Sequence, residues 1–118
     1  MKILGIRFCN VSADVKSDIN FFEDKLGLEN TFEKHQDFQG GIFATEDKSS
    51  WVECWQASEE MPEGIMLQLI VEDSDAVAAE AKANGQESFG PMDAHGERIY
   101  YVKTPTGLQI SFQSKIPS

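Results

Sequence analysis

Hydrophobic and polar residues alternate in five short stretches of the chain, and each alternation predicts a β-strand. The predicted strands cover residues 2–10, 50–56, 65–71, 98–103 and 108–113. Apolar residues recur every three or four positions between Asp14 and Leu26, which predicts an amphipathic helix. Its apolar stripe consists of Val15, Ile19, Phe22 and Leu26. A second, alanine-rich helix is predicted from Asp73 to Asn84.

The two predicted helices have similar ends. Asp14 is placed to cap the first helix and Asp73 or Ser74 the second, while Gly27 and Gly85 follow the last turns. The segment 21–29, which contains the last turns of the first helix, its glycine stop and the start of a strand, has a weaker counterpart in 80–89. Aligning these two segments also aligns aromatic residues and glycines, so the sequence predicts a duplicated unit.

Glycine and proline mark the expected breaks between elements. Gly40-Gly41 is interpreted as a turn within 29–43, and Phe89-Gly90-Pro91 as a loop or strand end. Residues 57–64 are interpreted as a linker, and 104–107 as a turn. These breaks predict one domain, 1–118, made of two modules, 1–57 and 64–118.

Composition narrows the classes of partner. The chain has 118 residues and a formal net charge of −10, so we expect it to repel nucleic acid and anionic membranes. No targeting segment or membrane span is recognisable, and a cytoplasmic location is expected. Cys9 and Cys54 stand apart, which predicts buried, reduced thiols instead of a disulfide.

The predicted strands have one apolar and one polar or mixed face, and the two helices are expected to cover the apolar faces. The apolar positions are Ile6, Phe8, Leu67, Leu69, Val71, Leu108, Ile110 and Phe112. The opposite faces carry Arg7, Trp51, Glu53, Trp55, Gln68, Gln109, Ser111 and Gln113. Such a face suits a ligand pocket, although the tryptophans could instead pack in a subunit interface or under a loop.

The chain resembles the vicinal oxygen chelate superfamily, which includes glyoxalase I, extradiol dioxygenases, and fosfomycin- and bleomycin-resistance proteins. The resemblance rests on Ile6-Arg7-Phe8 with Val11 and Asp14, on 21–28, and on the closing hairpin 96–110. It implies an α+β fold of two tandem βαβββ modules whose curved mixed sheets form a cup, in a homodimer.

The same resemblance implies four positions at which metal-using members carry their ligands: Arg7, Glu53, Met66 and Ser111. Only Glu53 among them is a good ligand for a divalent ion, because arginine is a fixed cation and methionine suits soft metals. We therefore expect no metal and no cofactor. Instead, Arg7 and Glu53 are expected to form an ion pair, either as a structural pair or with Arg7 binding a ligand anion.

Two hypotheses follow, and a dormant scaffold is a weaker third. The first is a metal-free, bleomycin-resistance-like protein that binds a small aromatic or anionic molecule. The second is a lyase, isomerase or transferase acting on a small polar molecule, with Glu53 as a base and Arg7 as an anion anchor, with or without a divalent metal. The expected ligand-binding residues are Arg7, Trp51, Glu53, Trp55, Met66, Gln68, Tyr101, Gln109 and Ser111. The resemblance to fosfomycin-resistance proteins suggests Tyr101, whereas His35 and His95 are interpreted as surface or hairpin residues.

Overall fold

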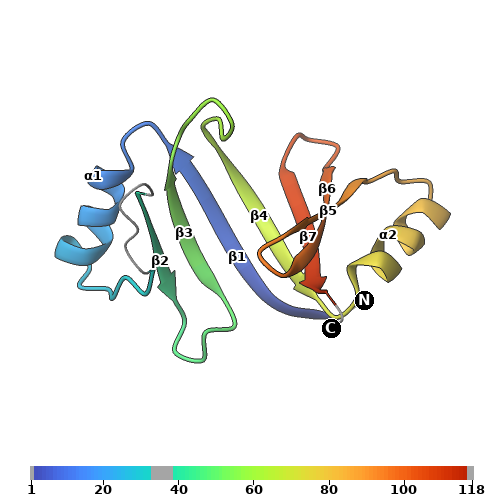
Figure 1. Cartoon of the computed structure of the whole chain (residues 1–118), viewed down its shortest axis with the longest axis horizontal. Coiled ribbons are helices and arrows are strands. Elements are labelled where there is room, and N and C mark those ends of the chain that lie inside the picture. The colour runs from blue at the N-terminus through green and yellow to red at the C-terminus, as the bar shows by residue number, and fades with distance from the viewer. Residues whose placement is uncertain (1, 33–38, 117–118) are drawn as a thin grey trace. The chain divides into compact units, whose positions relative to one another are not determined.

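A computed structural model describes residues 2–32 and 39–116 (Figure 1). The chain forms two compact units, the N-terminal unit Arg7–Ile65 and the C-terminal unit Met1–Ile6 with Met66–Ser118. In chain order the elements are β1 (Ile3–Ser12), α1 (Val15–Asn20), η1 (Phe21–Lys25), β2 (Gly40–Ala44), β3 (Trp51–Gln56), β4 (Gly64–Val71), α2 (Ser74–Ala83), β5 (Phe89–Ala94), β6 (Glu97–Lys103) and β7 (Gln109–Lys115). The predicted α+β class is confirmed, whereas the module bounds 1–57 and 64–118 stay predictions.

In the N-terminal unit the strand order is β2-β3-β1, with β1 parallel and β2 antiparallel to β3. Helix α1 packs on β3 and β2 (Figure 1). The core beneath it consists of Val15, Phe43 and Cys54, with Ile19 and Phe22 packed against them. Apolar side chains from one face of β2 and β3 therefore meet the apolar stripe of the helix, as the periodicity predicts.

The predicted helix from Asp14 to Leu26 begins as expected and ends differently. The Asp14 carboxylate accepts hydrogen bonds from the backbone N–H and the hydroxyl of Ser17, at 3.2 and 2.7 Å. After α1 the chain continues as the π-helical turn η1, which adds a residue to the turn. This extra residue rotates Leu26 out of the stripe, and the side chain is 53% exposed. Gly27 then leaves the helix with a φ of +70°.

The interpretation of Gly40-Gly41 as a turn is wrong, because both residues lie in β2, paired with Trp55 and Cys54. Asn30 Oδ1 accepts from the N–H of Ile42 at 3.1 Å, and the Ile42 carbonyl accepts from the N–H of Thr31 at 2.9 Å. The preceding segment thus satisfies outward-facing groups of this edge strand, which alternation alone does not show.

The C-terminal unit has the strand order β4-β7-β6-β5, in which β4 is parallel to β7 and the other pairs are antiparallel. Helix α2 packs on β6 and β7 (Figure 1), and the rings of Tyr100 and Phe112 stack at 5.4 Å. The residues around Pro91, expected as a loop or strand end, belong to β5, an edge strand with a bulge in its pairing to β6. Proline is tolerated at such an edge because no ladder hydrogen bond is lost there.

The helices cover less of the sheets than the pattern predicts. Phe8 is 41% exposed and Leu108 is 44% exposed, although both were expected to be covered. The reason is geometric: α1 packs on β2 and β3, and α2 on β6 and β7. The expectation holds for Val71 and Phe112, which are 3% and 5% exposed.

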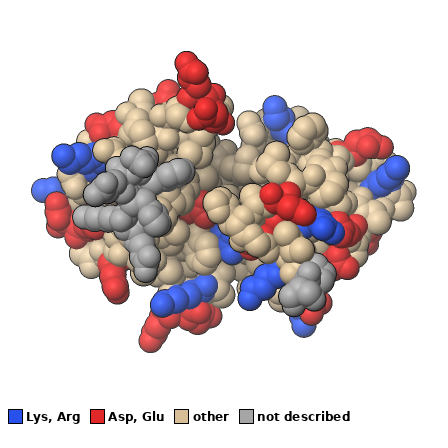
Figure 2. Space-filling model, viewed as in Figure 1, with Lys and Arg blue, Asp and Glu red and all other residues tan. Residues whose placement is uncertain are grey.

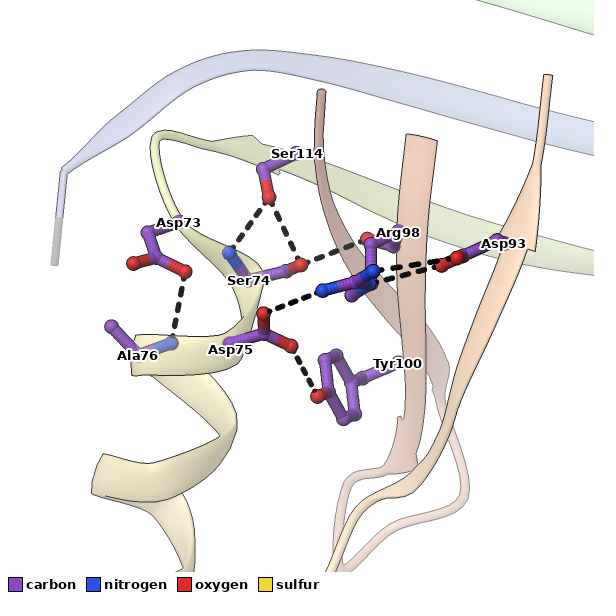
Figure 3. A network of polar contacts seen from close by, with 8 residues as sticks. All are labelled: Asp73, Ser74, Asp75, Ala76, Asp93, Arg98, Tyr100 and Ser114. Atoms are coloured by element: carbon purple, nitrogen blue, oxygen red, sulfur yellow. Dashed lines mark hydrogen bonds and ion pairs between the residues drawn. The ribbon is translucent and has the colours of Figure 1, made fainter. Parts of the chain in front are cut away.

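A polar network fixes α2 within the C-terminal unit (Figure 3). Asp73 caps the helix by accepting from the N–H of Ala76, as predicted. Ser74, only 1% exposed, donates its hydroxyl to the Arg98 carbonyl and its N–H to Ser114 Oγ, at 2.9 and 2.8 Å. In the next position Asp75 accepts from Arg98 and Tyr100. The first turn of α2 is thereby tied to two neighbouring strands.

The surface is acidic, in line with the charge of the sequence. Asp and Glu side chains are spread over the face drawn in Figure 2, with Lys and Arg side chains between them. No helix within residues 2–32 and 39–116 is long and apolar enough to cross a membrane.

Candidate functional site

Three predicted site residues line one face of β3. Trp51, Glu53 and Trp55 alternate with Val52 and Cys54, which point into the core beneath α1. The predicted alternation of this strand is therefore correct. Trp51, Glu53 and Trp55, together with Arg7, are called here the tryptophan cluster, and all of them belong to the N-terminal unit.

The carboxylate of Glu53 holds the two indoles. Trp51 Nε1 donates to Glu53 Oε2 at 2.7 Å, and Trp55 Nε1 donates to Glu53 Oε1 at 2.9 Å. Glu53 is only 8% exposed. Hydrogen bonds to an ionised acceptor are stronger than bonds between neutral groups, so each bond orients an indole firmly. Two large aromatic side chains are in this way fixed by one buried anion.

Cys9 lies beside Glu53 on the neighbouring strand, in register with it. Burial, together with the charge of Glu53 and a hydrogen bond to it, raises the pKa of the Cys9 thiol to about 12. From the sequence, Cys9 is predicted only to be a buried, reduced thiol. Strand alternation places Cys9 on the same face as Arg7, and this is the sequence signal by which it could have been included in the predicted site.

Arg7 lies over the ring of Trp51, with its Cζ atom 4.0 Å from the ring centroid. The two residues are in register between β1 and β3, which brings their side chains together. The contact uses the face of the guanidinium group, whereas its hydrogen bonds run in the plane. The ion pair expected between Arg7 and Glu53 stays a prediction.

Gly40 lies beneath the indole of Trp55. A Cβ atom at this position would overlap Cε3 and Cζ3 of the Trp55 ring and lie 3.0 Å from the Cys54 carbonyl oxygen. The indole also contacts the ring of Phe32, at a centroid distance of 4.9 Å and an interplanar angle of 85°. The close approach of the Trp55 ring to residue 40 is possible only because this residue has no side chain.

The remaining predicted residues lie in the C-terminal unit, on the sheet face opposite α2. Strand register sets Gln68, Ser111 and Tyr101 side by side on β4, β7 and β6. Met66 lies beside Gln109 one step further along. Register therefore brings these five residues onto one face, as alternation predicts, and a second group of polar residues forms there.

Ser111 has a partner that sequence reasoning did not include in the site. Its hydroxyl donates to Gln113 Oε1 at 2.8 Å, and Gln113 Nε2 donates to Glu97 Oε1 at 3.0 Å. Ser111 and Gln113 are 1% and 4% exposed. Strand alternation predicts Gln113 on this face but not among the ligand-binding residues, and Glu97 is not among the predicted site residues. Their link depends on the pairing of β6 with β7, which the sequence does not reveal.

The residues at the four family positions do not fit a divalent metal. Both oxygens of Glu53 already accept from indoles, and the Ser111 hydroxyl donates to Gln113. Arg7 is a cation and Met66 a soft ligand, which are unsuited to such ions. Within residues 2–32 and 39–116, no group of three or more His, Cys, Asp and Glu side chains is arranged to hold a metal.

The histidines differ in what the structure describes. His95 is exposed in the two-residue turn between β5 and β6, with a φ of 53°, which agrees with its interpretation as a hairpin residue. His35 lies outside the described residues. Cys9 and Cys54 are buried free thiols, as predicted.

Two surface hollows lie away from these residues. One, of about 310 Å³, is lined in the N-terminal unit by residues of 28–31 and 43–48. The other, of about 200 Å³, is lined in the C-terminal unit by Lys2 and residues of 71–80. Neither hollow is lined by a predicted site residue.

The family of the chain follows from comparison with known proteins. Residues 8–112 match the model described as the Glyoxalase/Bleomycin resistance protein/Dioxygenase superfamily. The chain belongs to this superfamily. The resemblance noted in the helix end and closing hairpin is thereby confirmed. A comparison with curated proteins finds no match.

Solved structures share the fold. A hypothetical protein from Bacillus halodurans C-125 is 20% identical, with a TM-score of 0.73 and coverage of 99% of this chain and 96% of that chain. A superfamily member from Vibrio splendidus 12B01 is 19% identical, with a TM-score of 0.69 and coverage of 93% and 97%. Methylmalonyl-CoA epimerase from Mycobacterium tuberculosis is 17% identical, with a TM-score of 0.72 and coverage of 98% and 88%. At such identities the likeness concerns the fold alone.

Proposed function

We propose that this superfamily member binds a small, planar aromatic anion at the tryptophan cluster without using a metal. The observation that carries the proposal is the placement of the Arg7 guanidinium carbon 4.0 Å from the ring centroid of Trp51, whose indole shares the Glu53 carboxylate with that of Trp55. A fixed aromatic surface beside a permanent cation suits a ligand that has a flat ring and a negative group.

The chemistry of each part supports this ligand class. Guanidinium pairs with carboxylate or phosphate through parallel in-plane N–H bonds, while its face stacks on an aromatic ring. Preorganised rings lose little conformational entropy on binding, because the bonds to Glu53 already restrict their rotamers. The donor set at the family positions supports metal independence, since Glu53 and Ser111 are engaged with other side chains.

A row of polar residues in the C-terminal unit is proposed to bind a neutral polar ligand group. Gln68, Ser111 and Tyr101 form a row across three strands, flanked by Met66 and Gln109. Because the Ser111 hydroxyl donates to Gln113, its oxygen is left to accept a hydrogen bond. This row is therefore suited to a ligand hydroxyl or amide group.

An enzyme that uses Glu53 as a base is the alternative within the same superfamily. Structural neighbours include methylmalonyl-CoA epimerase, which makes isomerase chemistry the natural comparison. The contacts favour it less, because a general base must reach the proton that it abstracts, and both oxygens of Glu53 accept from indoles. A binding role is consequently the better supported proposal.

Tryptophan fluorescence and calorimetry test the proposal, since both tryptophans of the chain belong to the cluster. We expect 1-naphthoate to quench the emission and to bind with one site per chain. Arg7→Gln should weaken binding at least tenfold, or about 1.4 kcal/mol. The matched control is Arg98→Gln, which removes the other arginine and should leave the affinity unchanged. If neither the tryptophan emission nor the heat signal of the wild-type protein responds to a broad panel of aromatic carboxylates and phosphates, the proposal is wrong.

We also propose that the chain is a homodimer. Large apolar side chains of the N-terminal unit remain exposed outside the contact with α1, among them Phe8 at 41% and Phe21 at 51%. Burying such residues against a second copy would be favourable. Light scattering coupled to size-exclusion chromatography measures the mass directly, and a monomer at micromolar concentration would contradict the proposal.

A further inference from the structure

We propose that Glu53 is a positioning residue and Gly40 a specificity-determining residue of the tryptophan cluster, and that together they make the site select flat aromatic acids over saturated acids of similar size. This inference rests on the proposed function of the same site and names which residues set its preference. It concerns only residues of the N-terminal unit, and it gives Glu53 a role other than that of a base.

The contacts of Glu53 define its part. Its two oxygens each accept from a different indole, so the carboxylate bridges Trp51 and Trp55 at 2.7 and 2.9 Å. Cys9 adds a third donor, since its thiol is hydrogen-bonded to the same carboxylate. At 8% exposure, Glu53 has little surface left for a ligand. It therefore acts on a ligand through the rings that it holds.

Gly40 sets the position of the second ring. Glycine is often required by a positive φ, but the φ of Gly40 does not lie in the positive region, unlike those of Gly27 and Gly64. The reason for glycine at this position is the indole above it, because a Cβ atom would overlap two carbon atoms of the Trp55 ring. The ring occupies the space that a side chain at residue 40 would need, and it donates to Glu53 from that position.

The two anchors together leave the indoles little rotational freedom. Each ring is held at its nitrogen by Glu53, and the Trp55 ring is also supported from below by Gly40. Stacking depends on parallel, offset surfaces. A ring of fixed orientation therefore binds a planar ligand more tightly than a puckered one. If Trp55 tilts, the contact with a planar ligand loses area, whereas a saturated ligand loses less.

Gly41 provides a matched control in the same strand. Its side of β2 faces α1, where an added Cβ atom would lie 3.1 Å from Asn30 Nδ2, 3.2 Å from Phe43 Cε2 and 3.3 Å from Ile19 Cγ1. Gly41→Ala therefore crowds the core of the same unit without touching either indole. Gly40→Ala and Gly41→Ala are the same chemical change at adjacent positions on opposite faces.

The test combines NMR with binding. The chain has two tryptophans, so its ¹H–¹⁵N spectrum contains two indole N–H signals. We expect Gly40→Ala to shift the Trp55 signal upfield as its bond to Glu53 lengthens, and to lower the ratio of the affinities for 1-naphthoate and its saturated counterpart decahydro-1-naphthoate at least fivefold. Gly41→Ala should leave both signals and the ratio near the wild-type values, even if it lowers stability.

Glu53→Gln is the second variant, and it keeps the shape of the side chain. The amide has one accepting oxygen, so one indole should lose its acceptor and its signal should move upfield, with faster exchange against solvent. If Glu53 acted only as a base and did not position the rings, both indole signals would stay in place in Glu53→Gln. This result would overturn the inference. Unchanged signals and an unchanged affinity ratio in Gly40→Ala would overturn it equally.

Failure of this inference is distinguishable from failure of the proposed function. If the wild-type protein binds neither acid, the proposed function is wrong and the selectivity falls with it. The indole signals of Gly40→Ala and Glu53→Gln still decide, without any ligand, whether these two residues position the rings.

Discussion

Two carboxylates, one in each unit, organise their surroundings in opposite ways. Glu53 is 8% exposed and accepts from the neutral indoles of Trp51 and Trp55. The side chain of Asp75 is 50% exposed and accepts from the charged Arg98 at 3.0 Å and from Tyr100 at 2.5 Å. Burial makes the first arrangement depend on every donor, because water cannot replace a lost partner there. At Asp75 water can do so.

The same contrast appears in the groups around each carboxylate. Burial, with help from Glu53, raises the pKa of Cys9 to about 12. In the exposed network, hydrogen bonds from Tyr100 and then Arg98 lower the pKa of Asp75, and the bond to Asp75 raises the pKa of Tyr100. The first effect is mostly desolvation and the second mostly hydrogen bonding. Salt and mutation should therefore affect the two regions differently.

The largest expected effect is on thiol chemistry. With its pKa raised from 9.0 to about 12, native Cys9 should be alkylated by iodoacetamide at pH 8 about a thousandfold more slowly than in the unfolded chain. Peptide mass spectrometry after timed labelling measures this for Cys9 and Cys54 separately. Native labelling within tenfold of the unfolded rate would contradict the buried contact with Glu53.

The raised pKa also sets a direction for stability at alkaline pH. A thiol that stays protonated in the fold stabilises it fully below the unfolded pKa, near 9, and this contribution is lost as the pH rises toward 12. The urea midpoint should consequently fall above about pH 9. Because Cys9→Ala removes this contribution, the midpoint of that variant should fall less steeply over the same range.

The next effect compares the two carboxylates directly. Glu53→Leu should lower the free energy of unfolding by about 2–3 kcal/mol, because two partly buried indole N–H groups lose their acceptor. Asp75→Leu is the same change in the exposed network and should cost several times less. Urea unfolding followed by far-ultraviolet circular dichroism measures both. Equal losses would refute the distinction drawn from burial.

A smaller effect tests the buried part of the network in the C-terminal unit. Ser74→Ala should cost about 1–2 kcal/mol, since the Arg98 carbonyl loses a donor in a site where Ser74 is only 1% exposed. Ser49→Ala is the control, because Ser49 donates to Asp47 in an exposed turn and water replaces that bond. Thermal unfolding of the two variants should differ clearly. A stable Ser74→Ala protein would place the support of α2 elsewhere.

The smallest effect concerns the exposed bond between Tyr100 and Asp75. A carboxyl with a lowered pKa stabilises the fold above its unfolded pKa, near 4, and loses this contribution as the pH falls. Tyr100→Phe should therefore lower the urea midpoint slightly at pH 6, by less than Ser74→Ala does, and the difference should shrink as the pH falls below about 4. A difference that stays constant as the pH falls would mean that the ring contact with Phe112 was disturbed instead.

Much of each unit could be predicted from the sequence. Alternation placed Trp51, Glu53 and Trp55 on one face, and cap residues placed the start of each helix, because both signals are local. The prediction of a turn at Gly40 was wrong, because the sequence does not distinguish a glycine required by a turn from one required by an indole fifteen residues away. Leu26 was misplaced because a single π-helical turn leaves no mark in the periodicity.

The candidate site was likewise predictable from the sequence only in part. The sequence supplied its members, including Arg7, Ser111 and Tyr101, through strand parity and the family resemblance. It did not reveal that Ser111 donates to Gln113 or that Cys9 lies beside Glu53. Those partners depend on which strands pair and in what register.

By itself, the sequence determined the α+β class, the superfamily and the faces of the strands, because these follow from patterns that repeat over a few residues. Only the tertiary structure decided what the charged residues do. It set Arg7 on the ring of Trp51, gave both oxygens of Glu53 to the indoles, and placed Trp55 on Gly40. Hydrogen bonds and ring contacts of this kind depend on distances of a few ångströms between strands, which no spacing along one strand encodes.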